Sequence, residues 1–272
     1  MADRDRRIHS IEPSRCFTTL GDSGQTGSMM CEPDRNGVPR AYVTADVAAV
    51  DAIGLAADWG WNLNTGQRLG ILIPHRAAIE ENSGLAQLDR SGKGVFATWR
   101  YSATNAKTSG PQIAYYPDLE HLLGVERRMP AGIVLVGADE THRSWITAYS
   151  PTLLAGKPIA DVEPAIDPVV AVAVATFTDS VNSSTGLVDR RDRSKVTDGL
   201  QRLLCHGYAF TSEQLIAAAL SDNWQGRRAY ALGALADDVL RGVRKQVRER
   251  YTDGIVERWQ AAASERGRED QP

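Results

Sequence analysis

The chain has 272 residues, of which 42% are hydrophobic and 24% are charged, and its formal net charge at pH 7 is -3. This length and apolar content suffice for a buried core in one large domain or two ordinary ones. The nearly balanced charge argues against a chain-wide attraction to nucleic acid or to an anionic membrane, and no apolar run approaches the roughly 20 residues of a membrane span.

The cysteines and the first residues of the chain both bear on its compartment. Cys16, Cys31 and Cys205 are widely spaced and odd in number, which favours reduced thiols over a disulfide framework. Asp3 to Arg7 alternate acidic and basic side chains where a secretory signal has an apolar stretch. We therefore expect a cytoplasmic protein that does not enter a membrane.

Residues 1–38 are rich in glycine and polar side chains without a sustained period, which predicts a loop-rich leader. From 39 to 155, short β-rich runs alternate with helical patterns, as is typical of βαβ units. The expected strands cover residues 41–45, 69–73, 94–98, 112–116 and 132–136. The expected helices cover residues 47–59, 77–88, 119–127 and 140–149. This alternation predicts an α/β domain with a Rossmann-like open parallel sheet.

Prolines and glycines interrupt residues 151–168, so the boundary to a second domain is expected there, with 156–168 as the linker. Residues 169–263 are then predicted to form a helical domain. Its expected helices run over 169–181, from an Asp192 cap to Gly207, and from about 212 onward. Thr211 and Gln214 match a capping box at that last start. Apolar residues from Leu232 to Trp259 predict one long final helix, and residues 264–272 a disordered tail.

Several motifs with known chemistry are absent from the sequence. The run Gly21 to Gly27 lacks the lysine and spacing of a Walker loop, and no Gly-x-Gly-x-x-Gly follows a predicted strand. There is no Gly-x-Ser-x-Gly nucleophile elbow, and no His or Cys pair has the spacing of zinc ligands. The sequence therefore identifies no cofactor and predicts no metal site.

Ligands of open parallel sheets bind outside the carboxyl ends of the strands. The residues expected at this edge are Asp46, His75, Arg76, Trp99, Arg100, Asp118, Asp139 and His142. They can bind an anion through their arginines or supply acid–base catalysis through His75 and a carboxylate. The alternative, which we favour, is that the three aspartates cap helices. An enzyme would bring at least two of Asp46, His75, Asp118 and Asp139 within hydrogen-bond reach.

A basic face is predicted on the final helix. Arg241, Arg244, Lys245 and Arg248 recur at steps of three or four residues, and a run of such side chains can contact phosphates. Asp237, Asp238 and Glu249 lie close by, however, and a charged outer face is ordinary for a solvated helix. Nucleic-acid contact is therefore the less favoured interpretation.

Three segments carry a resemblance. Leu69 to Asn82, Phe96 to Arg100, and Val181 to Leu187 with the helices of 208–240 are similar to uncharacterised proteins of high-GC Gram-positive bacteria. The resemblance covers most of residues 40–245 and implies an α/β part followed by a helical part. Those proteins have no assigned activity, so it implies no function.

We therefore expect a protein that binds a small molecule or a protein partner, at the strand carboxyl ends or in a cleft between its two parts. Two alternatives stay open. One is an enzyme acting on a phosphorylated or nucleotide-like small molecule. The other is a nucleic-acid-binding module that uses the C-terminal basic helices.

Overall fold

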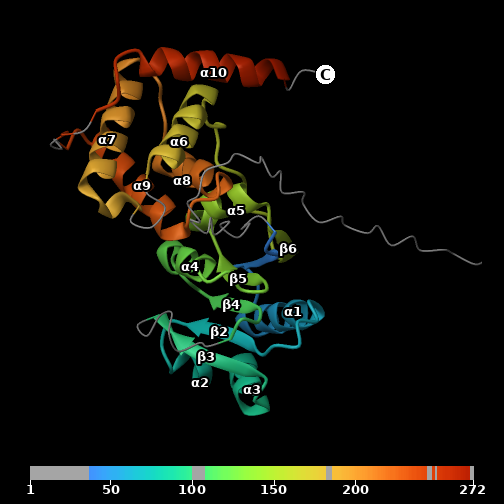
Figure 1. Ribbon diagram of the computed structural model, residues 1–272. Helices are drawn as coiled ribbons and strands as arrows, with labels where there is room; N and C mark the ends of the chain where they lie inside the picture. The colour runs from blue at the N-terminus through green and yellow to red at the C-terminus, as the bar shows by residue number, and fades with distance from the viewer. Residues whose placement is uncertain (1–36, 100–107, 182–185, 244–246, 249, 270–272) are drawn as a thin grey trace, which may run out of the picture. The chain divides into compact units, whose positions relative to one another are not determined.

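The computed structural model of the chain describes residues 37–99, 108–181, 186–243, 247–248 and 250–269. These residues contain an all-parallel, six-stranded sheet with the order β3-β2-β4-β5-β1-β6 (Figure 1). The strands are β1 (Arg40–Thr44), β2 (Leu69–Ile73), β3 (Gly94–Thr98), β4 (Gln112–Tyr115), β5 (Ile133–Ala138) and β6 (Thr152–Ala155). The predicted α/β fold with a parallel sheet is confirmed.

The sequence analysis placed the first five strands within a residue or two and missed β6. This strand has only four residues, lies at the edge of the sheet beside β1, and keeps Thr152 exposed. An edge strand of this kind shows neither a long apolar run nor a clear alternation. Pro151 and Gly156 on either side of it also resemble a loop.

Alternate residues of each central strand face two different apolar layers. Val43, Ile71, Ile113 and Val136 pack on one side of the sheet, with α1 (Ala49–Asn62), α2 (Ala78–Glu81) and α3 (Ser83–Ser91). The predicted single helix over 77–88 is wrong, because Asn82 leaves the helical conformation. Its side-chain oxygen accepts hydrogen bonds from the backbone N–H groups of Gly84 and Leu85 and so starts α3.

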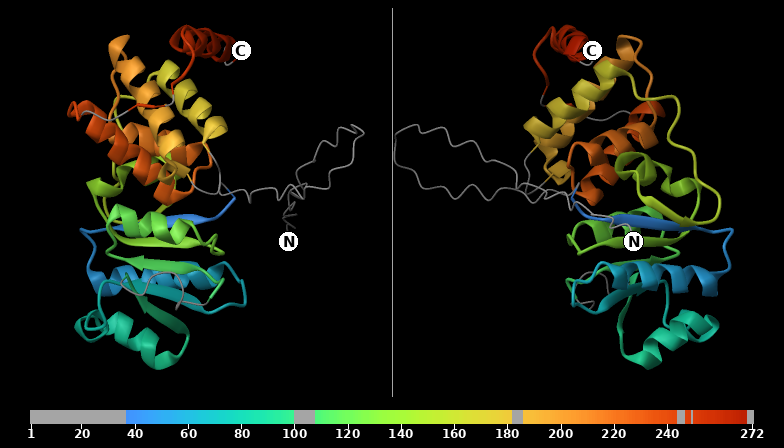
Figure 2. Two further views of the ribbon diagram at one scale, coloured as in Figure 1. Left: turned by 60° about the vertical axis from the view of Figure 1, so that its left-hand side comes forward. Right: turned by 90° about the vertical axis from the view of Figure 1, so that its right-hand side faces the viewer.

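The other side of the sheet, which includes Tyr42, Leu72 and Leu135, packs against helices that belong to both predicted parts of the chain. Helices α4 (Leu119–Glu126) and α5 (Arg143–Tyr149) lie next to this face, and α9 and α8 pack on them in turn (Figures 1 and 2). One apolar cluster thus continues from the sheet into the helical part, and residues 34–272 form one compact unit. The division into two domains at 156–168 stays a prediction.

The helical part consists of α6 (Pro168–Ser180), α7 (Arg190–Cys205), α8 (Ser212–Ser221), α9 (Gly226–Leu240) and α10 (Ile255–Glu269). The capping box of Thr211 and Gln214 is confirmed at the start of α8. Helix α7 begins earlier than predicted, because Asp189 rather than Asp192 accepts the capping hydrogen bond, from the backbone N–H of Arg191.

The single long final helix is a wrong prediction. Helix α9 ends at Leu240 and α10 begins at Ile255, and Gly242 and Gly254 between them adopt left-handed backbone conformations with φ of +70° and +76°. Left-handed glycines commonly terminate helices, whereas the apolar periodicity runs on across them. Helix α10 also continues to Glu269, where the sequence predicted a tail after residue 263. Within the described residues, no helix combines the length and apolar character needed to cross a bilayer.

Candidate functional site

The first predicted strand-end residue, Asp46, closes a turn at the carboxyl ends of β1 and β6. Its Oδ1 accepts hydrogen bonds from the Thr44 hydroxyl and, at 3.5 Å, from the backbone N–H of Lys157. The Thr44 hydroxyl is the largest cause of the lowered pKa of Asp46. Helix α1 starts only at Ala49 and has no side-chain cap, so the prediction that Asp46 caps it is wrong.

Asp118 and Asp139 do cap helical segments, as predicted. Asp118 accepts a hydrogen bond of 2.8 Å from the backbone N–H of His121 in the first turn of α4. Asp139 accepts one of 2.9 Å from the backbone N–H of Thr141 at the start of the 3-10 helix Glu140–His142. Burial raises the pKa of Asp139, but the hydrogen bonds from Thr141 and the charge of His142 outweigh it, so this pKa is lowered.

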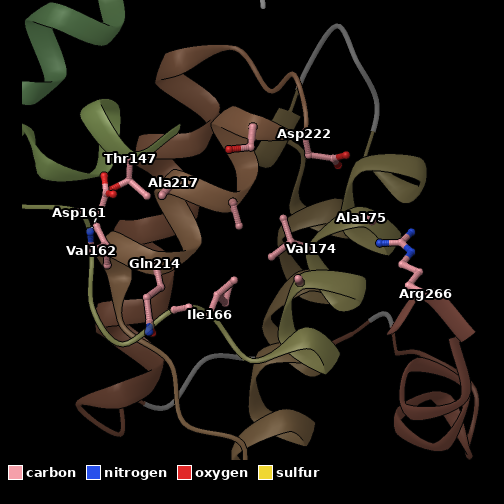
Figure 3. Close-up of a pocket in the computed structure, with 14 residues that line it drawn as sticks. Thr147, Asp161, Val162, Ile166, Val174, Ala175, Gln214, Ala217, Asp222 and Arg266 are labelled. Carbon is pink, nitrogen blue, oxygen red and sulfur yellow. Dashed lines mark hydrogen bonds between the residues drawn. The ribbon is translucent and has the colours of Figure 1, made fainter. Parts of the chain in front are cut away.

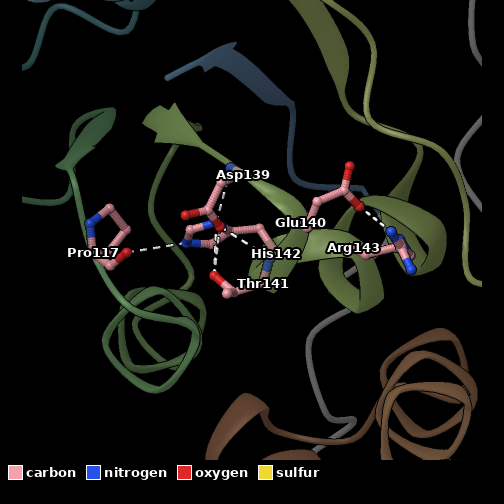
Figure 4. A network of polar contacts seen from close by, with 6 residues as sticks. All are labelled: Pro117, Asp139, Glu140, Thr141, His142 and Arg143. Carbon is pink, nitrogen blue, oxygen red and sulfur yellow. Dashed lines mark hydrogen bonds and ion pairs between the residues drawn. The ribbon is translucent and has the colours of Figure 1, made fainter. Parts of the chain in front are cut away.

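His142 is a buried structural link rather than an accessible base (Figure 4). Its Nε2 lies 3.0 Å from the carbonyl oxygen of Pro117, and because a carbonyl only accepts, Nε2 must donate the proton. Its Nδ1 lies 3.0 Å from Asp139 Oδ1 and 3.3 Å from the Asp139 backbone nitrogen. The imidazole thereby ties the end of β4 to the end of β5.

The other residues predicted at the strand carboxyl ends share no hydrogen bond with the side chains of the three aspartates, as far as the structure describes them. His75 and Arg76 are exposed in the turn after β2, where their carbonyl oxygens accept backbone hydrogen bonds. Trp99 is half-buried after β3, with its ring centroid 5.0 Å from that of His121. Arg100 lies outside the described residues.

The acid–base candidates of the sequence analysis were Asp46, His75, Asp118 and Asp139. Among the described residues, no hydrogen bond joins two of these four side chains. The three carboxylates instead hold turns and helix starts. Nor do three His, Cys, Asp or Glu side chains of the described segments gather into a set that could hold a metal ion.

The predicted basic helix face is divided between two segments. Arg241 ends α9 and pairs with Asp238 at 2.7 Å, whereas Arg248 lies beyond Gly242 with its backbone N–H 2.7 Å from the Ser194 hydroxyl. Arg244 and Lys245 lie outside the described residues. The four residues therefore do not share one continuous helix, and nucleic-acid contact stays a prediction.

A pocket of about 540 Å³ lies where the segment after β6 meets the helical part (Figure 3). Its apolar lining comes mainly from α6, α8 and residues 162–166. These lining residues are Val162, Ala165, Ile166, Ala171, Val174, Ala175, Ala217 and Ala218. Small alanines on the facing sides of α6 and α8 leave the space between the helices open. None of these residues was predicted as a site residue, because alanines on a helix face are equally compatible with close packing.

Most polar groups in the pocket wall are already hydrogen-bonded within the protein. The Thr147 hydroxyl accepts from the backbone N–H of Val162, Gln214 bonds Thr211 and the carbonyl oxygen of Pro164, and Asp222 accepts from the Thr178 hydroxyl. Asp161 and Arg266 are different: both are exposed, and neither has a hydrogen-bond or ion-pair partner within the described segments. Figure 3 shows them on opposite sides of the pocket.

Comparison with known protein families gives a match over the helical part of the chain. Residues 166–260 match a family described as a domain of unknown function, DUF1889. No curated protein and no solved structure matches the chain. The matched stretch begins just before α6 and ends within α10, so it contains most of the pocket lining and none of the sheet. Over this helical part, the chain is similar to a domain whose function is unknown.

Proposed function

We propose that the protein binds a small amphipathic molecule, with an aliphatic body and a charged end, in the pocket between α6, α8 and residues 161–166. The observation that carries this proposal is the pocket itself. Its volume of about 540 Å³ lies within the roughly 300–1,000 Å³ typical of small-molecule sites. Val174 and Ala217 in its wall are buried, so an apolar body placed there leaves water.

Two exposed, charged side chains in the pocket lining indicate that the ligand carries a charge at one end. Because the polar wall groups are satisfied within the protein, they favour an apolar body over a polar one. Asp161 and Arg266 are exposed parts of the pocket lining, where an ammonium or a carboxylate of the ligand can stay partly hydrated. Binding, rather than catalysis at the strand ends, is also favoured by the engagement of Asp46, Asp118 and Asp139 in turns and caps.

Two narrower expectations accompany the proposal. The cysteine pattern supports the cytoplasm as the compartment in which the protein works. The resemblance to uncharacterised proteins of high-GC Gram-positive bacteria supports the same α/β plus helical arrangement in them. We propose that those proteins share the pocket.

The test is a thermal-shift series with alkyl carboxylates and alkylamines of increasing chain length. A ligand that binds only the folded state raises the melting temperature. At a ligand concentration of about 100 times its Kd, it adds about 2.7 kcal/mol to the free energy of unfolding. For the unaltered protein we expect the shift to grow with chain length. Ala175→Leu, which places a larger side chain in the pocket, is expected to abolish the growth.

Ala261→Leu is the matched control, because Ala261 is exposed on α10 and does not line the pocket. It should respond to the ligands as the unaltered protein does. Equal shifts in Ala175→Leu and Ala261→Leu, or no shift for any chain length, would overturn the proposal. Arg266→Gln and Asp161→Asn then show which charge the ligand carries, since each is expected to weaken only one of the two ligand series.

A further inference from the structure

A second site is indicated by Arg128, just beyond the C-terminal end of α4. Its Nε and Nη1 atoms are buried and form no hydrogen bond with any residue that the structure describes. Burial lowers the pKa of this guanidinium, yet arginine stays charged at any physiological pH. Arg128 as a whole is half-buried, but a buried donor nitrogen without an acceptor is costly and calls for an explanation.

Arg128 lines a small pocket on the sheet face that α4 covers. The pocket lies along one face of α4 and reaches β2 and the end of β3. Its lining residues are Leu72, Trp99, Glu120, His121, Gly124, Val125, Arg128 and Arg227. Its volume of about 110 Å³ is well below the roughly 300–1,000 Å³ of a site for a whole ligand. The space suits one charged head group.

The second cation of this pocket comes from the helical part of the chain. Arg227 is exposed in the first turn of α9, a helix that begins without a side-chain cap. The start of α9 lies against α4 (Figure 1), and a Cβ at Gly226 would come within 2.5 Å of the Leu123 carbonyl oxygen. Helix N-termini attract anions through their free N–H groups and the helix dipole. Arg227, in that first turn, is the second arginine in the lining of the small pocket.

The remaining polar groups of the pocket do not cancel this positive charge. Glu120 is exposed at its rim. His121 is held through Nδ1 by Asp118 at 2.7 Å, so the Asp118 carboxylate is already engaged by a side chain and by a helix start. Trp99 packs against the His121 ring and, with Leu72, supplies the apolar part of the lining.

We infer that this pocket binds a phosphate-type oxyanion of a small ligand, with Arg128 and Arg227 as the anion's partners and Trp99 contacting the ligand's apolar part. Guanidinium groups pair with phosphate oxygens in a bidentate manner, and such charge-assisted hydrogen bonds are strong. An anion at this position supplies acceptors for Nε and Nη1 of Arg128. The site is separate from the larger pocket and does not depend on it.

The test is calorimetric titration of the full chain with inorganic phosphate and with phenyl phosphate at low ionic strength. We expect both to bind, phenyl phosphate more tightly because its ring contacts Trp99. Arg128→Gln is expected to weaken both by about 10-fold or more, the usual effect of losing a hydrogen bond between charged groups. Trp99→Leu is expected to remove the advantage of phenyl phosphate and to leave phosphate binding unchanged.

Arg127→Gln is the matched control, because Arg127 is exposed, adjacent in sequence and absent from the pocket. It removes the same charge and should leave binding unchanged. Glu120→Gln should tighten binding severalfold, because it removes a nearby carboxylate, and Arg227→Gln should weaken it. These two exposed positions test the site even where Arg128→Gln does not fold.

Three results would overturn the inference. The first is that neither phosphate nor phenyl phosphate binds at concentrations up to about 10 mM, which excludes even a weak site with a millimolar Kd. The second is equal weakening by Arg127→Gln and Arg128→Gln, which indicates an unspecific charge effect. The third is unchanged binding in a folded Arg128→Gln variant. Ala175→Leu should bind phosphate normally, which keeps this test separate from that of the larger pocket.

Discussion

Arg40 and Arg128 are two guanidinium groups of the same chain with opposite surroundings. Arg40 is 6% exposed, and its Nε and Nη2 each lie 2.8 Å from one carboxylate oxygen of Glu126. Its Nη1 donates to the carbonyl oxygen of Val38, and its Cζ lies 3.7 Å from the ring centroid of Tyr149. Arg128 follows Glu126 by two residues, and its buried Nε and Nη1 have no partner within the described chain.

The difference shows that this fold can give each nitrogen of a buried guanidinium a hydrogen-bond acceptor. Glu126, itself 1% exposed, accepts from Arg40 and also from the indole N–H of Trp145 at 2.7 Å. These partners come from β1, α4 and α5, so they tie the sheet to the two helices that cover it. The two buried nitrogens of Arg128 that lack a partner in the described chain belong to the lining of the small pocket, and Nε of Arg143 is buried without a described partner as well.

Breaking the ion pair between Arg40 and Glu126 should cause the largest loss in the free energy of unfolding. Glu126→Gln leaves the Arg40 charge buried without its counter-charge, and such changes typically cost about 3–5 kcal/mol. We expect urea denaturation to show a loss of this size in the free energy of unfolding. Glu120→Gln removes a carboxylate from the exposed first turn of the same helix and should change it by less than about 0.5 kcal/mol. Similar losses in the two variants would contradict the contrast drawn here.

Trp145→Phe tests a second interaction of the Glu126 carboxylate, the hydrogen bond from the Trp145 indole. Phenylalanine keeps most of the buried ring but removes the indole N–H that donates to Glu126. Hydrogen bonds to charged groups contribute about 1.5–3 kcal/mol, so we expect a loss in that range, smaller than that of Glu126→Gln. In a double-mutant cycle with Glu126→Gln the two losses should not add, because the residues share one hydrogen bond. Additive losses would separate Trp145 from the network.

The sequence predicted the sheet well because its information is local. Val43, Ile71, Ile113 and Val136 alternate with residues of the opposite face, and burial of both faces makes the strands continuously apolar. Likewise, Thr211 and Gln214 lie three residues apart and fix a helix start by themselves. Patterns of this range can be read without knowing what packs against them.

The sites could not be predicted in the same way. Arg40 and Glu126 are 86 residues apart, and Trp99, Arg128 and Arg227 come together only when the sheet, α4 and α9 pack. The prediction that Asp46 caps α1 failed because Asp46 accepts instead from the nearby Thr44 hydroxyl and from the backbone N–H of Lys157, 111 residues away and beyond the unpredicted strand β6. Of the predicted ligand residues, Trp99 lies in the lining of the small pocket.

Removal of the Arg128 guanidinium should have the opposite effect on the free energy of unfolding, because its buried nitrogens have no described partner. Arg128→Met keeps much of the length of the side chain but removes the unsatisfied buried nitrogens, so in phosphate-free buffer we expect the free energy of unfolding to rise by about 1 kcal/mol. Arg40→Met should lower the free energy of unfolding, since it leaves the buried Glu126 carboxylate without its counter-charge. Arg127→Met is the exposed control and should have little effect. A clear loss of stability in Arg128→Met would mean that Arg128 has structural partners within the protein.

A third polar cluster, around His142, lies between these extremes and should give the smallest effect. His142 is buried, but its acidic partner Asp139 is 55% exposed, so solvent screens their interaction. The pKa of Asp139 is lowered in the folded protein, so its contribution to stability is present above the ordinary aspartate pKa of 3.8 and is lost as the pH falls through its folded value. Asp139→Asn should therefore narrow the difference between the urea midpoints measured near pH 7 and near pH 3.

The asparagine variant isolates the charge, because its side-chain oxygen can still accept the capping hydrogen bond from the Thr141 backbone. A loss of stability that is equal at both pH values would therefore not arise from the negative charge of Asp139. If the midpoint difference stays as wide as in the unaltered protein, the charge of Asp139 does not stabilise the buried imidazole. His142 would then be held chiefly by hydrogen bonds from within the fold, the one to the Pro117 carbonyl among them.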